Sequence, residues 1–514
     1  KIDKGSFYFA KLKGKEINTE DELIKIIPKS LSRISWKKSM KWSDYNLSWG
    51  RPLTSIMSIF HKKHLKFKFA HLETVNFTYI EEDTEIKQRK IKDFEDYLKL
   101  LRKQEIVLDH NKRAKFITEK ILSICKKMSC QELIDQNLLL EVSNLVDKPR
   151  IITAQFDKKY LKLPKEVIKS TLQFHQKYFI LIDNKNQIRN DFIIVTNKQN
   201  SKNLIKLGNE RVVEARLSDA SFFWEKDKSS NLIKQINKLK QITFYENLGS
   251  VYEKTQRLRS MAYFISDQLD LNKEKVEIAA SVSKSDLVSG LVGEFPELQG
   301  IMGKYFALSQ GFEEDVSRAI SEHYLPTSIS SPVPKKPISC ALSIIDKLDT
   351  LVGFYLINEK PTSSKDPFAL RRAAIGLLRT IIENNLVVKL RDLIDYSTKI
   401  YLDQGVKQLN NVAGKDLLIF FRERMKNILK ERKIRTDIVQ ASISSHFSDN
   451  FLELYKKTLI MNKFISKDLG KNAVSTYKRA SNILVQEKLK SKNGPDAVLF
   501  KHEEEKELFE RINS

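Results

Sequence analysis

Cysteine and histidine are scarce in this 514-residue chain, and neither forms a recognisable site. The three cysteines, Cys125, Cys130 and Cys340, have neither a paired metal-ligand spacing nor the pattern of a disulfide framework. They predict a reducing compartment. The eight histidines are scattered and none is followed directly by Asp, which leaves a His-Asp type of metal phosphohydrolase site without an obvious ligand set.

Long apolar runs and common catalytic motifs are also missing. No apolar stretch approaches the roughly 20 residues of a membrane span, and the start has no signal-peptide pattern. Lys304 follows Gly303 but precedes Tyr305, so there is no phosphate-binding P-loop. No His-Glu-x-x-His zinc helix or Gly-x-Ser-x-Gly elbow occurs. We therefore expect a cytoplasmic, soluble protein, and because the chain begins at Lys1 rather than Met we expect it to be part of a longer polypeptide.

Positive charge is in excess. The chain has 90 Lys and Arg against 65 Asp and Glu, a formal charge of +25. Such a field attracts polyanions over long range, so nucleic acid is the first partner to consider. The alternative is a Lys-rich surface that only maintains solubility.

The length predicts three or four domains. The fold class is α+β and multidomain, with α+β modules first and mostly helices afterwards. We place the modules at residues 1–150, 151–225, 226–415 and 416–514.

Strands are predicted in the first two modules. Lys66–Ala70 alternates polar and apolar residues, as a half-buried strand does. Tyr178–Asp183 and Phe192–Thr196 are apolar runs separated by a short polar turn, which indicates a hairpin. The aromatic run Phe7–Ala10 is a further strand candidate, and Asn493–Asp496 is a predicted turn.

Helices dominate after residue 226. Val251–Leu269 shows one apolar helical face, with Lys254 and Arg257 off it. Leu325–Pro337 is rich in proline and serine and predicts a loop. Asp366 followed by Pro367 predicts the N-cap and first turn of a helix.

Two arginines precede this helical part. Arg211 and Arg216 are expected on a helix, where pairing with Glu210 and Glu214 is favoured over a contact with substrate.

Basic residues are interleaved with two indoles near the start of the chain. Lys38 and Lys41 precede Trp42 in the sequence, and Arg51 comes shortly after Trp49. Such a patch can stack bases and hold phosphates. Alternatively, the two indoles anchor a strand pair and the lysines are solvated.

A second basic face is predicted on the helix after Asp366. Arg372 and Arg379 share it, and Gly376 between them would let an RNA backbone approach closely. The competing interpretation is a surface ion pair of Arg379 with Glu383 at i+4.

One place brings imidazole and carboxylates together. His323 precedes Asp346 and Asp349, whose spacing of three residues puts them on one helix face. Metal ligation is one possibility; capping and ion pairing are favoured.

Several motifs occur in an order that closely resembles the β subunit of bacterial glycyl-tRNA synthetase. The resemblance covers essentially the whole chain. The segments that carry it are Lys38-Ser-Met-x-Trp42, Gln176-Lys-Tyr-Phe179, Gly208-Asn-Glu-Arg-Val-Val213, Val292-Gly-Glu-Phe-Pro-Glu-Leu-Gln-Gly-Ile-Met-Gly303, Asp346-Lys-Leu-Asp-Thr-Leu351 and Lys365-Asp-Pro-Phe-Ala-Leu-Arg-Arg372.

The resemblance implies a non-catalytic subunit that binds and positions tRNA-Gly for a separate α subunit in an α2β2 heterotetramer. The α subunit would hold ATP and Mg²⁺, so we expect no catalytic residue, no metal and no bound cofactor in this chain. The implied helical module is similar to the His-Asp (HD) phosphohydrolase fold, and residues 416–514 would lead into a truncated anticodon-binding domain. The alternative function is a stand-alone HD-fold phosphohydrolase. The candidate tRNA-binding residues are Lys365, Arg371, Arg372, Arg379, Lys38, Lys41 and Arg51.

Overall fold

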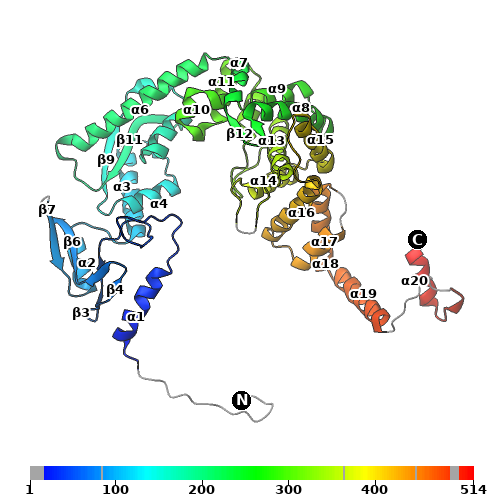
Figure 1. The fold of residues 1–514 in the computed structure, drawn as a ribbon, viewed down its shortest axis with the longest axis horizontal. Helices are drawn as coiled ribbons and strands as arrows, with labels where there is room; N and C mark the ends of the chain where they lie inside the picture. The colour runs from blue at the N-terminus through cyan, green and yellow to red at the C-terminus, as the bar shows by residue number, and fades with distance from the viewer. Residues whose placement is uncertain (1–16, 83–84, 363–364, 446–448, 487–496, 514) are drawn as a thin grey trace, which may run out of the picture. The chain divides into compact units, whose positions relative to one another are not determined.

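A computed structural model describes residues 17–82, 85–362, 365–445, 449–486 and 497–513 (Figure 1). Two sequence predictions, the strand at Phe7–Ala10 and the turn at Asn493–Asp496, lie outside these residues. The chain forms two compact units: Lys1–Leu161 with Thr171–Glu214, and Lys162–Ser170 with Ala215–Ser514. The predicted division into four modules stays a prediction. None of the described helices combines the length and apolar composition that crossing a membrane requires.

The first unit mixes short strands with helices, as the α+β fold class predicts. Its helices are α1 (Thr19–Ser32), α2 (Phe94–Lys103), α3 (His110–Lys127), α4 (Gln136–Leu145) and the first half of α6 (Leu204–Lys228). Its strands are β1 (Ile56–Met57), β2 (Ile59–Phe60), β3 (Lys63–His64), β4 (Lys68–Phe69), β5 (Leu72–Val75), β6 (Phe77–Glu82), β7 (Glu85–Lys90), β8 (Gln131–Glu132), β9 (Arg150–Gln155), β10 (Phe179–Ile182) and β11 (Ile188–Thr196).

A four-stranded sheet organises the second half of this unit, in the order β8-β10-β11-β9. The predicted hairpin is confirmed: β10 and β11 pair antiparallel, with Phe179 opposite Ile193. Both residues are fully buried against α3 and α4, where Ile117, Ile121 and Val142 complete a core. The apolar runs thus become strands because a helical layer covers one face of the sheet.

The predicted alternation around β4 is also confirmed. Phe67 and Phe69 are buried, whereas Lys66 and Lys68 are exposed. The period of two therefore places aromatic rings inside and ammonium groups in solvent.

The predicted pairing of Arg216 within α6 is wrong. Its guanidinium donates to Glu294 Oε1 at 2.8 Å, at the end of α10 (Gly290–Glu294). Glu214 instead binds Lys159 Nζ at 3.0 Å. Glu210 accepts the backbone N–H of Gln155 at 2.8 Å. Packing partners from other elements lie closer than the i+4 neighbours that the sequence offers.

The second unit is almost entirely helical. Its elements are α5 (Lys165–Lys169), the second half of α6, α7 (Leu232–Gln235), β12 (Thr243–Tyr245), β13 (Gly249–Ser250), α8 (Val251–Leu269), α9 (Lys273–Val282), α10, α11 (Ile301–Ser309), α12 (Glu314–Glu322), α13 (Pro337–Leu356), α14 (Leu370–Glu383), α15 (Leu390–Asp403), α16 (Ala413–Glu431), α17 (Thr436–Ser445), α18 (Phe451–Ser466), α19 (Asp468–Gln486) and α20 (Glu503–Asn513).

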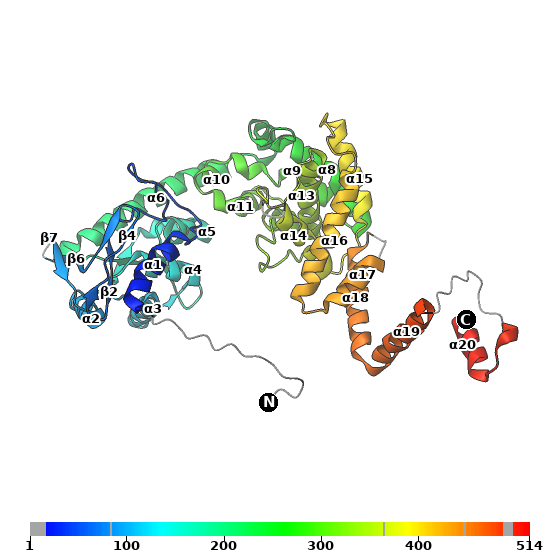
Figure 2. The same cartoon turned by 60° about the horizontal axis from the view of Figure 1, so that its bottom comes forward.

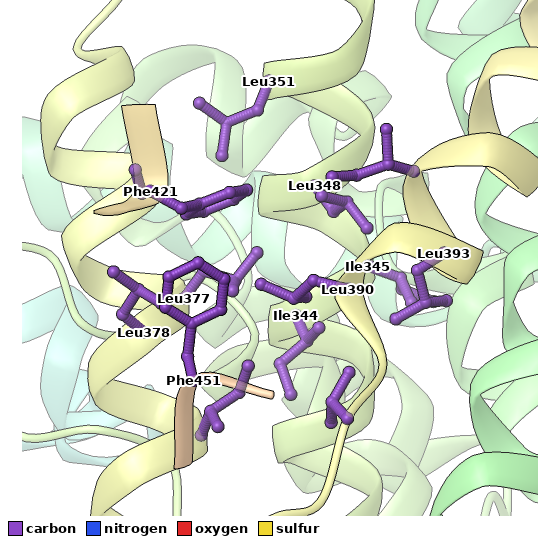
Figure 3. Close-up of a cluster of buried hydrophobic side chains, with 14 of the residues drawn as sticks. Ile344, Ile345, Leu348, Leu351, Leu377, Leu378, Leu390, Leu393, Phe421 and Phe451 are labelled. Atoms are coloured by element: carbon purple, nitrogen blue, oxygen red, sulfur yellow. The ribbon is translucent and has the colours of Figure 1, made fainter. Parts of the chain in front are cut away.

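Helix α13 is the centre of this unit. Its sequence is apolar on nearly every side, and most of its residues are buried, as expected for a helix enclosed by others. Figure 3 shows Ile344 and Leu348 of α13 in one buried cluster with Leu377 of α14 and Phe421 of α16, and Ile345 beside Leu390 and Leu393 of α15. In Figures 1 and 2, α13 lies among α8, α14 and α16, which it contacts.

The loop that joins α12 to α13 runs from His323 to Lys336; the loop predicted at Leu325–Pro337 overlaps it, apart from Pro337, which begins α13. Side chains that lie outside the loop bind its backbone carbonyls. Lys347 Nζ donates to the carbonyl of Leu325 at 2.7 Å, and Asn384 Nδ2 donates to that of Pro334 at 3.0 Å.

The start of α14 differs from the prediction. The helix begins at Leu370 rather than in the turn after Asp366, because Ala369 adopts a left-handed backbone with φ 54°. The Asp366 carboxylate nevertheless accepts the backbone N–H groups of Leu370 and Arg371, at 2.9 and 3.0 Å. Asp366 therefore caps the helix from a preceding turn.

A buried carboxylate fixes the segment before α11. Asp286 Oδ2 accepts the backbone N–H groups of Gly300, at 2.5 Å, and Gly303, at 3.0 Å. Gly300 has φ 77°, a region that favours glycine. A Cβ on Gly303 would lie 2.7 Å from Ile320 Cγ2 and 3.0 Å from Asp286 Oδ2. The Gly-Ile-Met-Gly sequence thus lets α11 approach both the carboxylate and α12.

Replacing Gly303 by Ala should destabilise the protein by about 1–3 kcal/mol, because the new methyl group has no room. Urea unfolding monitored by circular dichroism measures the change. Gly293→Ala is the matched control: no atom lies within 4 Å of the position that its new methyl group would take, so the helix propensity of Ala should leave stability equal or slightly higher. Equal effects at both positions would contradict the packing argument.

Candidate functional site

The most unusual feature of the second unit is a group of charged side chains inside its helical core. We call it the ionic centre; its residues are Lys254, Arg257, Lys284, His323, Asp346 and Asp349. They come from α8, the turn after α9, the end of α12 and α13. Arg257, His323 and Asp349 are fully buried, and Lys254 and Lys284 are 4% exposed.

Arg257 and Asp349 form the inner pair. Arg257 Nε donates to Asp349 Oδ1 at 2.6 Å, and its guanidinium lies 4.0 Å from the ring centroid of Tyr401. The Tyr401 hydroxyl donates to the Asp349 backbone carbonyl at 2.9 Å. Burial alone would raise the pKa of Asp349, but Arg257 and Lys254 outweigh it and hold that pKa below its usual value.

Asp346 forms the outer pair with two lysines from different elements. Its Oδ1 lies 3.3 Å from Lys254 Nζ and 3.1 Å from Lys284 Nζ. Burial opposes ionisation, yet the two amines together keep the pKa of Asp346 well below its ordinary range. Lys254 also bonds Asp349 Oδ2 at 3.1 Å, which links the two pairs.

His323 is neutral and its tautomer follows from its neighbours. Nδ1 faces the Ile320 carbonyl at 2.8 Å, and since a carbonyl only accepts, Nδ1 carries the proton. Nε2 is therefore an acceptor toward Lys284 Nζ at 2.7 Å. Burial lowers the pKa of His323 well below its usual value. The Lys284 amine thus fills the space between the imidazole and Asp346.

The predicted convergence is confirmed for His323 and Asp346, which Lys284 joins, and both Asp346 and Asp349 are used in ion pairs. In the part of the chain that the structure describes, no group of three or more His, Cys, Asp or Glu side chains is arranged to hold a metal ion.

Two charged residues of α8 were not recognised from the sequence as part of this centre. Lys254 and Arg257 were predicted to lie off the apolar face, but both point into the core. A signal was present: they are spaced three residues apart, as are Asp346 and Asp349. Matched spacing of opposite charges on two helices indicates a buried pairing when one of the helices is otherwise apolar, as α13 is.

A pocket of about 310 Å³ opens beside the ionic centre, and we call it the α13–α14 pocket. Asp346, Lys347 and Thr350 of α13 form one side, and Arg372 and Ala373 of α14 form the other. The remaining lining residues are Gln299, Tyr324, Pro326, Thr327, Phe368 and Ala369.

The candidate tRNA-binding residues near this pocket differ in how exposed their side chains are and in whether protein atoms already bind them. The side chains of Arg372 and Lys365 are exposed. Arg371 is half-buried and its guanidinium donates to the Thr362 carbonyl. Only Arg372 of the three lines the pocket. Their contacts with RNA stay predictions.

Arg379 is held by protein atoms. Its Nε donates to Glu383 Oε1 at 2.8 Å, and its Nη1 donates to the carbonyls of Ile329 and Ser331 at 2.6 and 3.0 Å. The competing ion pair is therefore confirmed. Gly376 does not offer an open face: it is buried, and a Cβ there would lie 3.1 Å from Pro326 Cγ. The predicted close approach of an RNA backbone at Gly376 is wrong, because the α12–α13 loop covers it.

The basic and aromatic patch of the first unit is formed by Lys38, Lys41 and Arg51, all exposed. An antiparallel bridge joins Met40 to Trp49. Trp42 and Trp49 are half-buried, and the bridge is isolated rather than part of a strand pair, so both alternatives for these indoles stay predictions.

One indole beside this patch was not singled out from the sequence. Trp36 is 41% exposed, and its ring centroid lies 4.9 Å from that of Trp49. It is the indole that a base could reach.

Removing one member of the ionic centre should be costly. Lys254→Met leaves Asp346 and Asp349 with less neutralising charge in a dry environment, and we expect a loss of about 3–5 kcal/mol in unfolding free energy. Lys457→Met on α18 breaks an exposed i,i+4 pair with Glu453 and should change stability by less than about 0.5 kcal/mol. Chemical denaturation of both variants tests this; similar small losses would refute a stabilising role for the centre.

The stability should also depend on the protonation of Asp286. Burial raises its pKa to about 6 from 3.8, so between these values the folded state holds a proton that the unfolded state releases. The stability from this group is complete below about pH 4 and is lost as the pH rises through 6, by about 3 kcal/mol in total. Melting curves of the protein and of Asp286→Asn should diverge across this range; parallel pH profiles would contradict the shift.

Comparison with known proteins places these features in a family. The family model described as glycyl-tRNA synthetase beta subunit matches residues 1–444. The glycine--tRNA ligase beta subunit of Rickettsia canadensis (strain McKiel) is 38% identical over 511 residues, covering 99% of this chain and 74% of that protein. That of Rickettsia bellii (strain OSU 85-389) is 39% identical over 512 residues, covering 99% of this chain and 75% of that protein. This chain belongs to the glycyl-tRNA synthetase beta subunit family.

Proposed function

We propose that this chain is the tRNA-binding subunit of a glycine--tRNA ligase and that a separate α subunit carries the active site. In this proposal the chain binds tRNA-Gly and positions it while the α subunit uses ATP and Mg²⁺ to attach glycine. An α2β2 assembly and a cytoplasmic location belong to the same proposal.

The single observation that carries the proposal is the family match over residues 1–444. The formal charge of +25 agrees with a polyanionic partner. The ionic centre agrees with a supporting role as well, because its charged groups bind one another. Family membership favours this interpretation over a stand-alone HD-fold phosphohydrolase.

Two surfaces offer groups that suit RNA. On the first unit, exposed Lys38, Lys41 and Arg51 accompany the exposed indole of Trp36, which combines phosphate contacts with a stacking surface. On the second unit, Arg372 and Lys365 are exposed near the α13–α14 pocket. Arg371 and Arg379 complete the predicted set, although protein carbonyls already bind their guanidinium groups.

Charging of tRNA-Gly should require both chains. We expect no glycine transfer from this chain alone and full activity when the α subunit is added in trans, measured with radiolabelled glycine. A preparation of this chain that charges tRNA-Gly without the α subunit would refute the division of roles.

Arg372→Ala should weaken tRNA binding and reduce the slope of log affinity against log salt by about one, because one phosphate contact is lost. Arg391→Ala, which removes an exposed arginine from α15, is the matched control and should leave the slope unchanged.

Arg379→Ala tests the remaining assignment in the same titration. A reduced slope would support a phosphate contact, whereas an unchanged slope with a lower melting temperature would assign Arg379 to the α12–α13 loop alone.

A further inference from the structure

The α13–α14 pocket combines features that suit a single nucleotide. We propose that it binds one unstacked nucleotide of the RNA, with a base that carries an exocyclic amine inside and the backbone phosphate at Arg372. That the nucleotide belongs to tRNA-Gly rests on the proposed function. The chemistry that would recognise the nucleotide is argued from the residues that line the pocket.

The floor of the pocket is an ionised acceptor. Asp346 is paired with Lys254 and Lys284 through Oδ1, its side chain is 13% exposed, and it is one of the residues that line the pocket. A carboxylate accepts hydrogen bonds from an exocyclic amine such as N4 of cytosine. Uracil presents a carbonyl oxygen at that position, which the carboxylate repels, and the one donor on the same edge is its ring N3–H. The floor therefore favours cytosine over uracil.

The walls are aromatic rings that other contacts already fix. Phe368 stacks on Phe354 with centroids 4.2 Å apart and planes at 21°. Tyr324 has the Lys284 amine 4.1 Å from its ring centroid. Because these contacts hold the rings before a ligand arrives, a base that contacts either lining ring loses little free energy to ordering. Stacking on fixed aromatic rings is a common mode of recognising unpaired bases.

The rim supplies the phosphate contact. Arg372 is exposed, and no ion pair joins it to any residue that the structure describes. A guanidinium binds phosphate through paired N–H donors. Gln299 and Thr327 are exposed on the same rim and offer further polar contacts.

The size limits the ligand. At about 310 Å³ the pocket is at the lower end of the ~300–1,000 Å³ typical of small-molecule sites, which suits one nucleotide and excludes a helical stem. The bound nucleotide must therefore come from a single-stranded or everted position of the RNA.

Blocking the pocket provides the test. Ala373→Leu places a larger side chain among the lining residues, and we expect its affinity for tRNA-Gly to fall about tenfold in a filter-binding assay. Ala441→Leu adds the same atoms at an exposed position of α17 and should bind as the unmodified chain does. If thermal melting shows that Ala373→Leu is unfolded, Thr327→Trp on the exposed rim replaces it.

A matched pair of mononucleotides tests the chemistry. CMP and UMP differ in the exocyclic group at position 4 and in the proton on N3; because the amine of CMP donates to Asp346, CMP should compete with tRNA for the pocket at least fivefold more effectively than UMP, and Ala373→Leu should remove the difference. Equal competition by both would overturn the role of Asp346.

The outcomes separate this inference from the proposed function. If the unmodified chain binds tRNA-Gly and supports charging while the pocket variants bind equally well, the pocket inference fails and the proposed function stands. If the chain does not bind tRNA-Gly but binds CMP in preference to UMP, with the difference lost in Ala373→Leu, the proposed function fails and the pocket remains a nucleotide site.

Discussion

The neutralisation of Asp346 by two lysines is the interaction on which the second unit depends. Asp346 belongs to α13, the helix around which the other helices pack, so an uncompensated charge there would oppose the whole core. Lys254 arrives from α8 and Lys284 from the turn after α9. The ion pairs therefore fix the approach of three parts of the chain, whereas apolar packing alone would tolerate sliding of one helix along another.

The ionic centre also places an amine where a neutral imidazole and a carboxylate converge. Such a pair of groups commonly binds a cation, and here the cation is a lysine side chain attached to the polymer itself. Its occupancy does not depend on ion concentration, and its geometry is set by folding. A centre of this kind suits a scaffold better than a catalyst, because its donors and acceptors are committed to each other.

The sequence predicted elements where one physical signal dominated. Alternation at Phe67 and Phe69, and the apolar runs of β10 and β11, identified strands because burial on one face or both was the main constraint. The sequence did not predict that Lys254 and Arg257 are buried, because their burial depends on partners nearly one hundred residues away. Arg216 was misassigned for the same reason: its acceptor Glu294 is distant in sequence.

Some residues of the candidate site were predicted from the sequence, but its pocket was not. His323, Asp346 and Asp349 were identified from their order in the sequence and from the spacing that puts the two carboxylates on one helix face. The α13–α14 pocket could not be predicted, because its lining comes from separate segments whose meeting depends on tertiary packing. The left-handed Ala369 that delays the start of α14 leaves no mark in the sequence, since alanine ordinarily favours a helix.

The attachments of the α12–α13 loop have a consequence for how this protein can vary. The side chains of Lys347, Arg379 and Asn384 donate hydrogen bonds to backbone carbonyls of the loop. A carbonyl is present whatever the residue, so the exposed side chain of Ile329, whose carbonyl Arg379 binds, can be replaced while the path of the loop stays the same. A substitution that alters this path should instead be one at Lys347, Arg379 or Asn384, which lie in α13, in α14 and directly after α14, outside the loop itself.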